Sequence, residues 1–184
     1  MVEKISLIFV IEDARWKRIA GLRARLAKAA AATHAFLPKK LRFPASATVL
    51  LGHNAGVRKL NRAFRGFDKP TNVLSFPQFE AAGLAKQGKK GGGIELGDIA
   101  LAYQYIVSEA EKGHKILINH VTHLVIHGLL HLFGYDHGQD GEAARMEGLE
   151  KKIMRRLGLP DPYKPMPASN GKSRKKGRAK TKRP

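Results

Sequence analysis

The stretch ILINHVTHLVIHGLLHLFGY, residues 116–135, decides the fold because it is the most apolar part of the chain. It has the length of a membrane span, but it contains four histidines, whose polar rings are costly to place in lipid. We therefore predict a buried helix over residues 115–133, in a cytoplasmic protein. At about 100° per residue, His127 and His131 lie roughly 40° apart on one face of this helix.

The turn after this helix supplies a third histidine. Gly134 can take the left-handed conformation that ends a helix, so the chain can turn back and bring His137 to the same point as His127 and His131. Three imidazoles leave one position of a tetrahedral site open for water. Zn²⁺ is the predicted occupant, with nickel, copper or manganese as alternatives. A cluster of polar rings inside an apolar helix is costly without a ligand, so we predict metal binding rather than simple packing.

Other residues of the helix restrict the chemistry. His120 and His123 share the histidine face as alternative ligands, but with three ligands supplied we expect them to support the ligands or contact the substrate. The spacing H-x-x-x-H-x-x-G-x-x-H is that of the metzincin metallopeptidases, in which a glutamate after the first histidine is the general base. Here that position is Gly128, which cannot transfer a proton. Another reaction of a metal-activated water is therefore expected.

The rest of the chain predicts an α+β fold with a small four-stranded mixed sheet. Strands are predicted over residues 5–11, 47–51 and 72–76, and within 94–103. Helices are predicted over residues 15–36, 55–64, 103–113, 115–133 and 140–157. Asp13 and Asn54 are the expected caps of the first two helices, and residues 80–93 are expected to form a flexible loop. The connection to the fourth strand contains no convincing helix, so we expect one antiparallel strand, with about five helices packed on the sheet.

Composition and charge exclude some functions and favour a polyanionic partner. The absence of cysteine excludes disulfides, thiolate zinc sites, iron–sulfur clusters and a cysteine nucleophile. The net charge is +19, with +13 in residues 1–94 and nine Lys or Arg but no acid in residues 164–184. Such an excess predicts nucleic-acid binding. We predict one metallohydrolase domain over residues 1–163, with its metal site in 120–137, and a basic disordered tail over 164–184.

The segment HGLLHLFGYDH, residues 127–137, resembles the signature of the YbeY family of bacterial metal-dependent endoribonucleases, the rRNA maturation factors. The resemblance extends over about residues 3–163. Further matching blocks are His120-x-x-His123, residues 61–77, Leu96-Gly97-Asp98-Ile99, Met146–Glu150 and Gly158–Tyr163.

The resemblance implies a cytoplasmic endoribonuclease specific for single-stranded RNA. It implies 3′-end maturation of small-subunit (16S) rRNA and ribosome quality control, with an rRNA precursor and the small ribosomal subunit as partners and no membrane. It also implies that His127, His131 and His137 bind one zinc ion, and that Arg65 faces the metal across a basic cleft. Zinc would activate a water and polarise a phosphoryl oxygen, while Arg65 would stabilise the charge that develops on the phosphorane.

Several other residues are candidates for the site. RNA contacts are predicted for Arg65, Lys69, Thr71 and Ser75. Asp98 either orients a ligand histidine or only starts a strand, and Asp136 is expected to support the ligands from the turn. His123 or the metal hydroxide is the candidate general base.

Two alternatives stay open. The first is a metallohydrolase of a non-RNA substrate such as a peptide, against which Gly128 argues. The second is a noncatalytic RNA-binding ribosome-assembly factor with structural zinc, whose site would be closed by a fourth protein ligand, His123 or Asp136.

Overall fold

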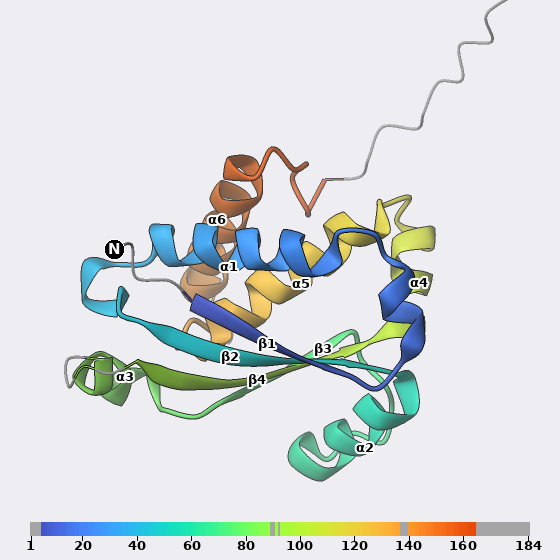
Figure 1. The fold of residues 1–184 in the computed structure, drawn as a ribbon, viewed down its shortest axis with the longest axis horizontal. Coiled ribbons are helices and arrows are strands. Elements are labelled where there is room, and N and C mark those ends of the chain that lie inside the picture. Colours follow the sequence, from blue (N-terminus) through green and yellow to red (C-terminus); the bar gives the residue numbers. More distant parts are fainter. Residues whose placement is uncertain (1–4, 89–90, 92, 137–139, 165–184) are drawn as a thin grey trace, which may run out of the picture.

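The computed structural model describes residues 5–88, 91, 93–136 and 140–164, and Figure 1 shows a sheet with helices on both faces. The strands are β1 (Ile5–Ile11), β2 (Ala45–Gly52), β3 (Val73–Pro77) and β4 (Ile94–Ala102). They form one sheet in the order β1-β2-β4-β3, in which β1, β2 and β4 are parallel and β3 is antiparallel to β4. The predicted mixed sheet with one antiparallel strand is confirmed.

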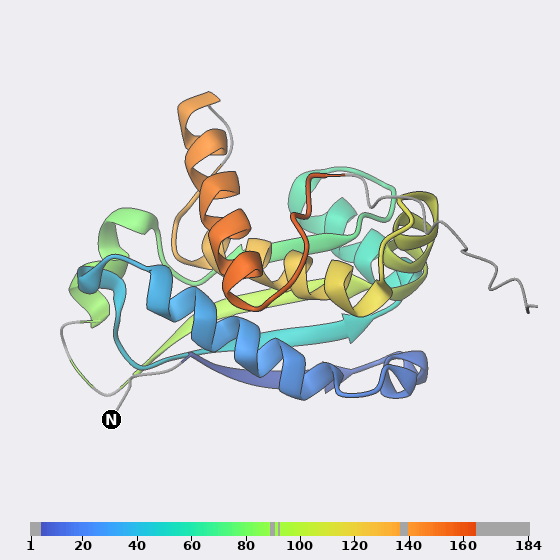
Figure 2. The same ribbon diagram turned by 90° about the horizontal axis from the view of Figure 1, so that it is seen from above.

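Six α-helices surround the sheet within the described residues. They are α1 (Leu22–Phe36), α2 (Asn54–Arg65), α3 (Ala81–Gly88), α4 (Tyr103–Lys112), α5 (Leu117–Leu132) and α6 (Asp140–Arg156). Helices α1, α5 and α6 lie on one side of the sheet and α2 lies on the other, as Figure 1 and the view turned by 90° in Figure 2 show. No helix in these parts of the chain is long and apolar enough to cross a membrane.

The first predicted helix is two separate elements. Asp13 caps a short 3-10 helix, Ala14–Arg18, rather than a long α-helix, and α1 begins only after Gly21. Gly21 has a φ of 70°, a left-handed conformation that interrupts the helical path. Within the 3-10 helix, the buried Trp16 donates a hydrogen bond from Nε1 to the carbonyl oxygen of Gly52 at 2.9 Å. This bond ties the short helix to the end of β2.

The expected cap of α2 is also corrected. His53 is the N-cap, and its Nδ1 accepts a hydrogen bond from the backbone N–H of Gly56 at 3.2 Å. Asn54 is instead the first helical residue, and its side-chain oxygen accepts from the backbone N–H of Tyr105 at 2.9 Å. Asn54 therefore connects α2 to α4, a contact between elements that are distant in the sequence.

The glycine-rich segment expected to be a loop contains helix α3. Leu84 is fully buried, so one turn of this segment is anchored in the core. The ring of Phe43 lies against Gly88, where an added Cβ would come within 2.0 Å of the ring. Burial of Leu84 supplies the stability that the local composition does not predict. Residues 89, 90 and 92 of this segment lie outside the described residues, as does the predicted tail except Lys164.

Helix α5 is the central element of the core. It contacts α1, α4, α6, β3 and β4, and Ile126, Leu129 and Leu130 are fully buried. At Gly128 an added Cβ would lie 3.0 Å from two side-chain carbons of Ile99 and 3.1 Å from Oγ of Ser75. The residue that replaces the metzincin glutamate thus lets the helix approach the sheet closely.

Candidate active site

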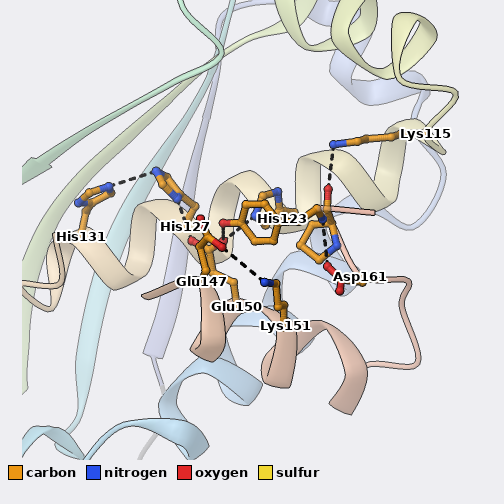
Figure 3. A network of polar contacts seen from close by, with 10 residues as sticks. Lys115, His123, His127, His131, Glu147, Glu150, Lys151 and Asp161 are labelled. Atoms are coloured by element: carbon orange, nitrogen blue, oxygen red, sulfur yellow. Dashed lines mark hydrogen bonds and ion pairs between the residues drawn. The ribbon is translucent and has the colours of Figure 1, made fainter. Parts of the chain in front are cut away.

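Helix α5 presents its last two histidines toward each other, as Figure 3 shows. The Nε2 atoms of His127 and His131 are 3.1 Å apart. The helix ends as predicted, because Gly134 has a φ of 79°. The backbone N–H of Gly134 donates to the carbonyl of His131 at 2.9 Å, and that of Tyr135 donates to the carbonyl of Leu130 at 3.0 Å. These two bonds form a Schellman motif, which turns the chain after the last histidine of the helix.

A buried glutamate from α6 supports two of the histidines (Figure 3). Glu150 has no exposed surface, and its carboxylate accepts hydrogen bonds at 2.8 Å from His127 Nδ1 and from His123 Nε2. The hydroxyl of Tyr163 donates to the same carboxylate. Burial alone raises the pKa of Glu150, but the hydrogen bonds from His123 and His127 outweigh it and lower the pKa to about 2. Glu150 is therefore an anionic acceptor at neutral pH.

This carboxylate determines the tautomer of His127. An ionised carboxylate only accepts hydrogen bonds, so Nδ1 of His127 carries the proton that bonds to Glu150. In the neutral ring, Nε2 then holds a lone pair, which faces Nε2 of His131. A carboxylate behind a histidine is the usual way to orient a metal-ligating imidazole.

The two facing nitrogens fit a metal ion. Two zinc–nitrogen bonds of about 2.0–2.1 Å at a tetrahedral angle place the nitrogens about 3.3 Å apart, close to the separation of 3.1 Å between the two Nε2 atoms. The same separation fits a hydrogen bond between the rings. The third predicted ligand, His137, lies outside the described residues. Within the described part of the chain, no three metal-ligating side chains meet.

A cleft of about 730 Å³ lies over these histidines. Its lining includes Arg65, Ser75, His127, His131 and Asp136. Arg65 is the last residue of α2 and is exposed, so a helix on the opposite side of the sheet brings a guanidinium to the histidines of α5. Among the described residues Arg65 has no acidic partner, unlike Arg58, which pairs with Asp68 at 2.8 Å. Its charge is available to an anion in the cleft.

A second polar network supports the wall of the cleft. His120 Nε2 lies 3.0 Å from Glu109 Oε2, and the same carboxylate accepts from Asn72 Nδ2 at 3.0 Å. Burial acts to raise the pKa of Glu109, but the hydrogen bonds from His120 and Asn72 keep the pKa below its ordinary value. Asn72 lines the cleft. His120 thus acts on the cleft through Glu109 and Asn72, in agreement with a supporting role rather than that of a ligand.

Two predicted roles do not fit the geometry. His123 does not line the cleft, because its Nε2 faces Glu150 and its ring packs against Tyr163 with centroids 5.5 Å apart. This position argues against His123 as general base or as a fourth ligand. Asp98 points to the opposite face of the sheet, since strand residues alternate and its neighbour Ile99 faces α5. Asp98 therefore cannot orient a ligand histidine.

The predicted RNA contacts divide between two hollows. Ser75 lies in the cleft, whereas Lys69 and Thr71 line a neighbouring groove that shares Arg65 with it. The turn residue Asp136 is exposed beside the histidines, where it was expected.

The supporting carboxylates were not identified from the sequence, although one signal was present. In α6 the buried positions Met146, Ile153 and Met154 lie on one stripe, and Glu150 falls on the same stripe at helical spacing. A charged residue on a buried stripe indicates a buried partner. No local pattern identifies Glu109 or Tyr163, because their partners are on other elements.

Comparison with known proteins finds relatives over most of the chain. The family model described as Endoribonuclease YbeY matches residues 11–158. Endoribonuclease YbeY of Nitrobacter winogradskyi is 44% identical over 163 residues, which cover 88% of this chain and 83% of that protein. The protein of the same name from Ruegeria sp. is 45% identical over 84% of this chain and 94% of its own length. The solution structure of TM1509 from Thermotoga maritima is similar with a TM-score of 0.49 and 22% identity, covering 87% of this chain and 99% of that one.

Proposed function

Since the chain belongs to the YbeY family of endoribonucleases, we propose that it is a metal-dependent endoribonuclease that cuts single-stranded RNA in the cleft between Arg65 and the α5 histidines. The observation that carries the proposal is that one cleft holds both the guanidinium of Arg65 and the facing Nε2 atoms of His127 and His131. The net charge of +19 supports an RNA substrate.

The proposed metal is zinc, held by His127, His131 and His137. Zinc at such a site supplies a nucleophilic water near neutral pH and withdraws charge from a phosphoryl oxygen. Glu150 would keep His127 in the tautomer that a metal requires, by accepting the proton of its Nδ1. The Schellman turn at Gly134 ends α5 three residues before His137, the third proposed ligand.

Arg65 is the proposed electrostatic catalyst. Charge develops on the nonbridging oxygens as the phosphodiester is attacked, and a guanidinium offers paired donors to two of these oxygens. Because Arg65 has no acidic partner among the described residues, no ion pair there must be broken to reach the phosphate. Ser75 in the cleft is a candidate donor to the same phosphate.

The biological substrate follows from the family. We propose 3′-end maturation of small-subunit (16S) rRNA and a part in ribosome quality control, in the cytoplasm. The partners would be an rRNA precursor and the small ribosomal subunit. The names of the relatives support the endoribonuclease reaction, and the sequence resemblance supports the rRNA target.

The experiment is single-turnover cleavage of a single-stranded RNA at saturating enzyme, which separates chemistry from binding. Loss of one preorganised donor typically lowers turnover by ~10²–10³-fold, so Arg65→Ala should lose cleavage while keeping fold and metal. Arg65→Lys should rescue partly, because lysine keeps the charge without the paired donors. Arg62→Ala is the matched control, since this exposed arginine of the same helix lines neither the cleft nor the neighbouring groove. A normal rate for Arg65→Ala would remove this residue from the mechanism.

A further inference from the structure

A second groove, about 490 Å³ in volume, begins beside the cleft and carries an exposed aromatic ring. It is lined by Phe67, Lys69 and Tyr105, and it shares Arg65 and Val73 with the cleft. Phe67 is 58% exposed. The cleft with the histidines and the groove with this ring therefore adjoin at Arg65.

The loop that carries Phe67 is held in place by contacts on both sides of the ring. The backbone N–H of Phe67 donates to the carbonyl of Asn61 at 3.3 Å. The side chain of Asn61, which is buried, donates in turn to the carbonyl of Lys69 at 2.7 Å. Arg58 clamps Asp68 with two hydrogen bonds of 2.8 Å. The ring is thus presented to solvent on a preorganised loop, which reduces the entropy lost when a ligand binds.

The surroundings of this ring distinguish it from an ordinary surface phenylalanine. Phe64, at the same end of α2, is 68% exposed but packs edge-on against Phe76 with ring centroids 5.0 Å apart. Phe67 packs against no other ring within the described residues, and Nζ of Lys69 lies 5.9 Å from its centroid. An exposed aromatic ring that packs on no other ring and lies beside cations is the arrangement that binds single-stranded nucleic acid, in which bases stack and phosphates are neutralised.

We propose that Phe67 is a stacking platform for a base that flanks the site of cleavage, while Lys69 contacts a phosphate of the same strand. This inference rests on the proposed function and adds a nucleotide subsite to it. Stacking is tolerant of base identity, because every base has a π-face. The subsite would therefore favour unpaired strands over duplexes without selecting a sequence.

The test measures RNA affinity separately from cleavage, with the full chain and a fluorescein-labelled decamer of single-stranded RNA. Base stacking on an aromatic side chain is typically worth about 1–3 kcal/mol, so Phe67→Ala should weaken binding by about 5- to 150-fold. Phe67→Trp should keep the affinity. Phe64→Ala is the matched control, because it removes another exposed phenylalanine, which packs on Phe76 and does not line the groove. The affinity of this variant for the RNA should change less than twofold.

Two further readouts separate stacking from charge. Phe67→Ala should leave the slope of log Kd against log salt concentration unchanged. Lys69→Ala should lower this slope by about 1, because only the lysine neutralises a phosphate. In Phe67→Trp the new indole should be quenched by RNA. The chain's own tryptophan, Trp16, is 1% exposed and is shielded from the strand.

The outcomes distinguish the subsite from the proposed enzyme. Equal affinity of Phe67→Ala and wild type, or no quenching of Phe67→Trp at saturating RNA, would overturn the subsite even if RNA is cut, and would leave Phe67 as a contact for a protein. Weakened RNA binding by Phe67→Ala with an unchanged salt slope would support the subsite, whether or not the RNA is cut. Absence of cleavage by the wild-type protein would instead count against the endoribonuclease activity.

Discussion

Replacing the buried Glu150 with glutamine tests whether this carboxylate organises the histidines. Glutamine keeps the shape but replaces one acceptor oxygen with an NH₂ donor. Glu150 accepts from His123, His127 and Tyr163, so at least one donor would then face another donor. A hydrogen bond to a charged group is typically worth about 1.5–3 kcal/mol, and this is the expected loss of unfolding free energy.

The pKa of Glu150 gives a second measure of the same interaction. Lowering this pKa from 4.5 to about 2 corresponds to about 3 kcal/mol in favour of the ionised carboxyl group, at about 1.4 kcal/mol per pH unit. Because the folded-state pKa is lowered, this stability is complete above about pH 4.5 and is lost as the pH falls toward 2. Glu150→Gln has no such group, so its stability should fall less steeply across this range than that of wild type.

The assay is thermal unfolding followed by circular dichroism. For a chain of this size 1 kcal/mol shifts Tm by about 2–4 °C, so Glu150→Gln should melt about 3–12 °C below wild type at neutral pH. The control is Glu147→Gln, one helical turn away, whose side chain is 45% exposed and faces Lys151 at 3.4 Å. An exposed pair of this kind contributes roughly 0.3–0.5 kcal/mol, so the control should melt within about 2 °C of wild type. Equal melting temperatures for the two variants would refute the role assigned to Glu150.

Three further predictions concern the turn, the metal and the tail. Gly134→Ala should destabilise the fold by about 2–4 kcal/mol in urea unfolding, because φ is 79° and the new Cβ would lie 2.4 Å from a methyl carbon of α3. Gly158→Ala has a similar φ of 69° and nothing within 4 Å, so it should show only the backbone strain, about 1–2 kcal/mol. His131→Ala should abolish the proposed zinc in elemental analysis, since two remaining imidazoles hold it poorly; full zinc content would reject the ligand assignment. Deleting residues 165–184, which hold eight Lys or Arg and no acid, should lower the salt dependence of RNA binding without unfolding the domain, and a loss of the cooperative melt would contradict this.

Local periodicity was sufficient for the elements that form the core. The run ISLIFVI predicts a strand over residues 5–11, and β1 has these bounds. The apolar stretch with histidines predicts a buried helix over 115–133, and α5 spans Leu117–Leu132. Gly134 ends that helix in a left-handed conformation, as its position predicts. These features depend on steric preferences and on burial patterns within one segment, which neighbouring residues determine.

Contacts between distant segments decided the rest. Whether Asp98 faces α5 or solvent depends on the register of β4 against its neighbours. The burial of Leu84, and with it helix α3, depends on a core that residues distant in the sequence form. Glu150 becomes a partner of His127 only because α6 packs on α5. Arg65 meets the histidines because its helix, α2, and α5 both contact β3, the strand at one edge of the sheet. A sequence pattern records which face of an element is apolar, but not which element packs on that face, so the tertiary structure alone assembled the cleft.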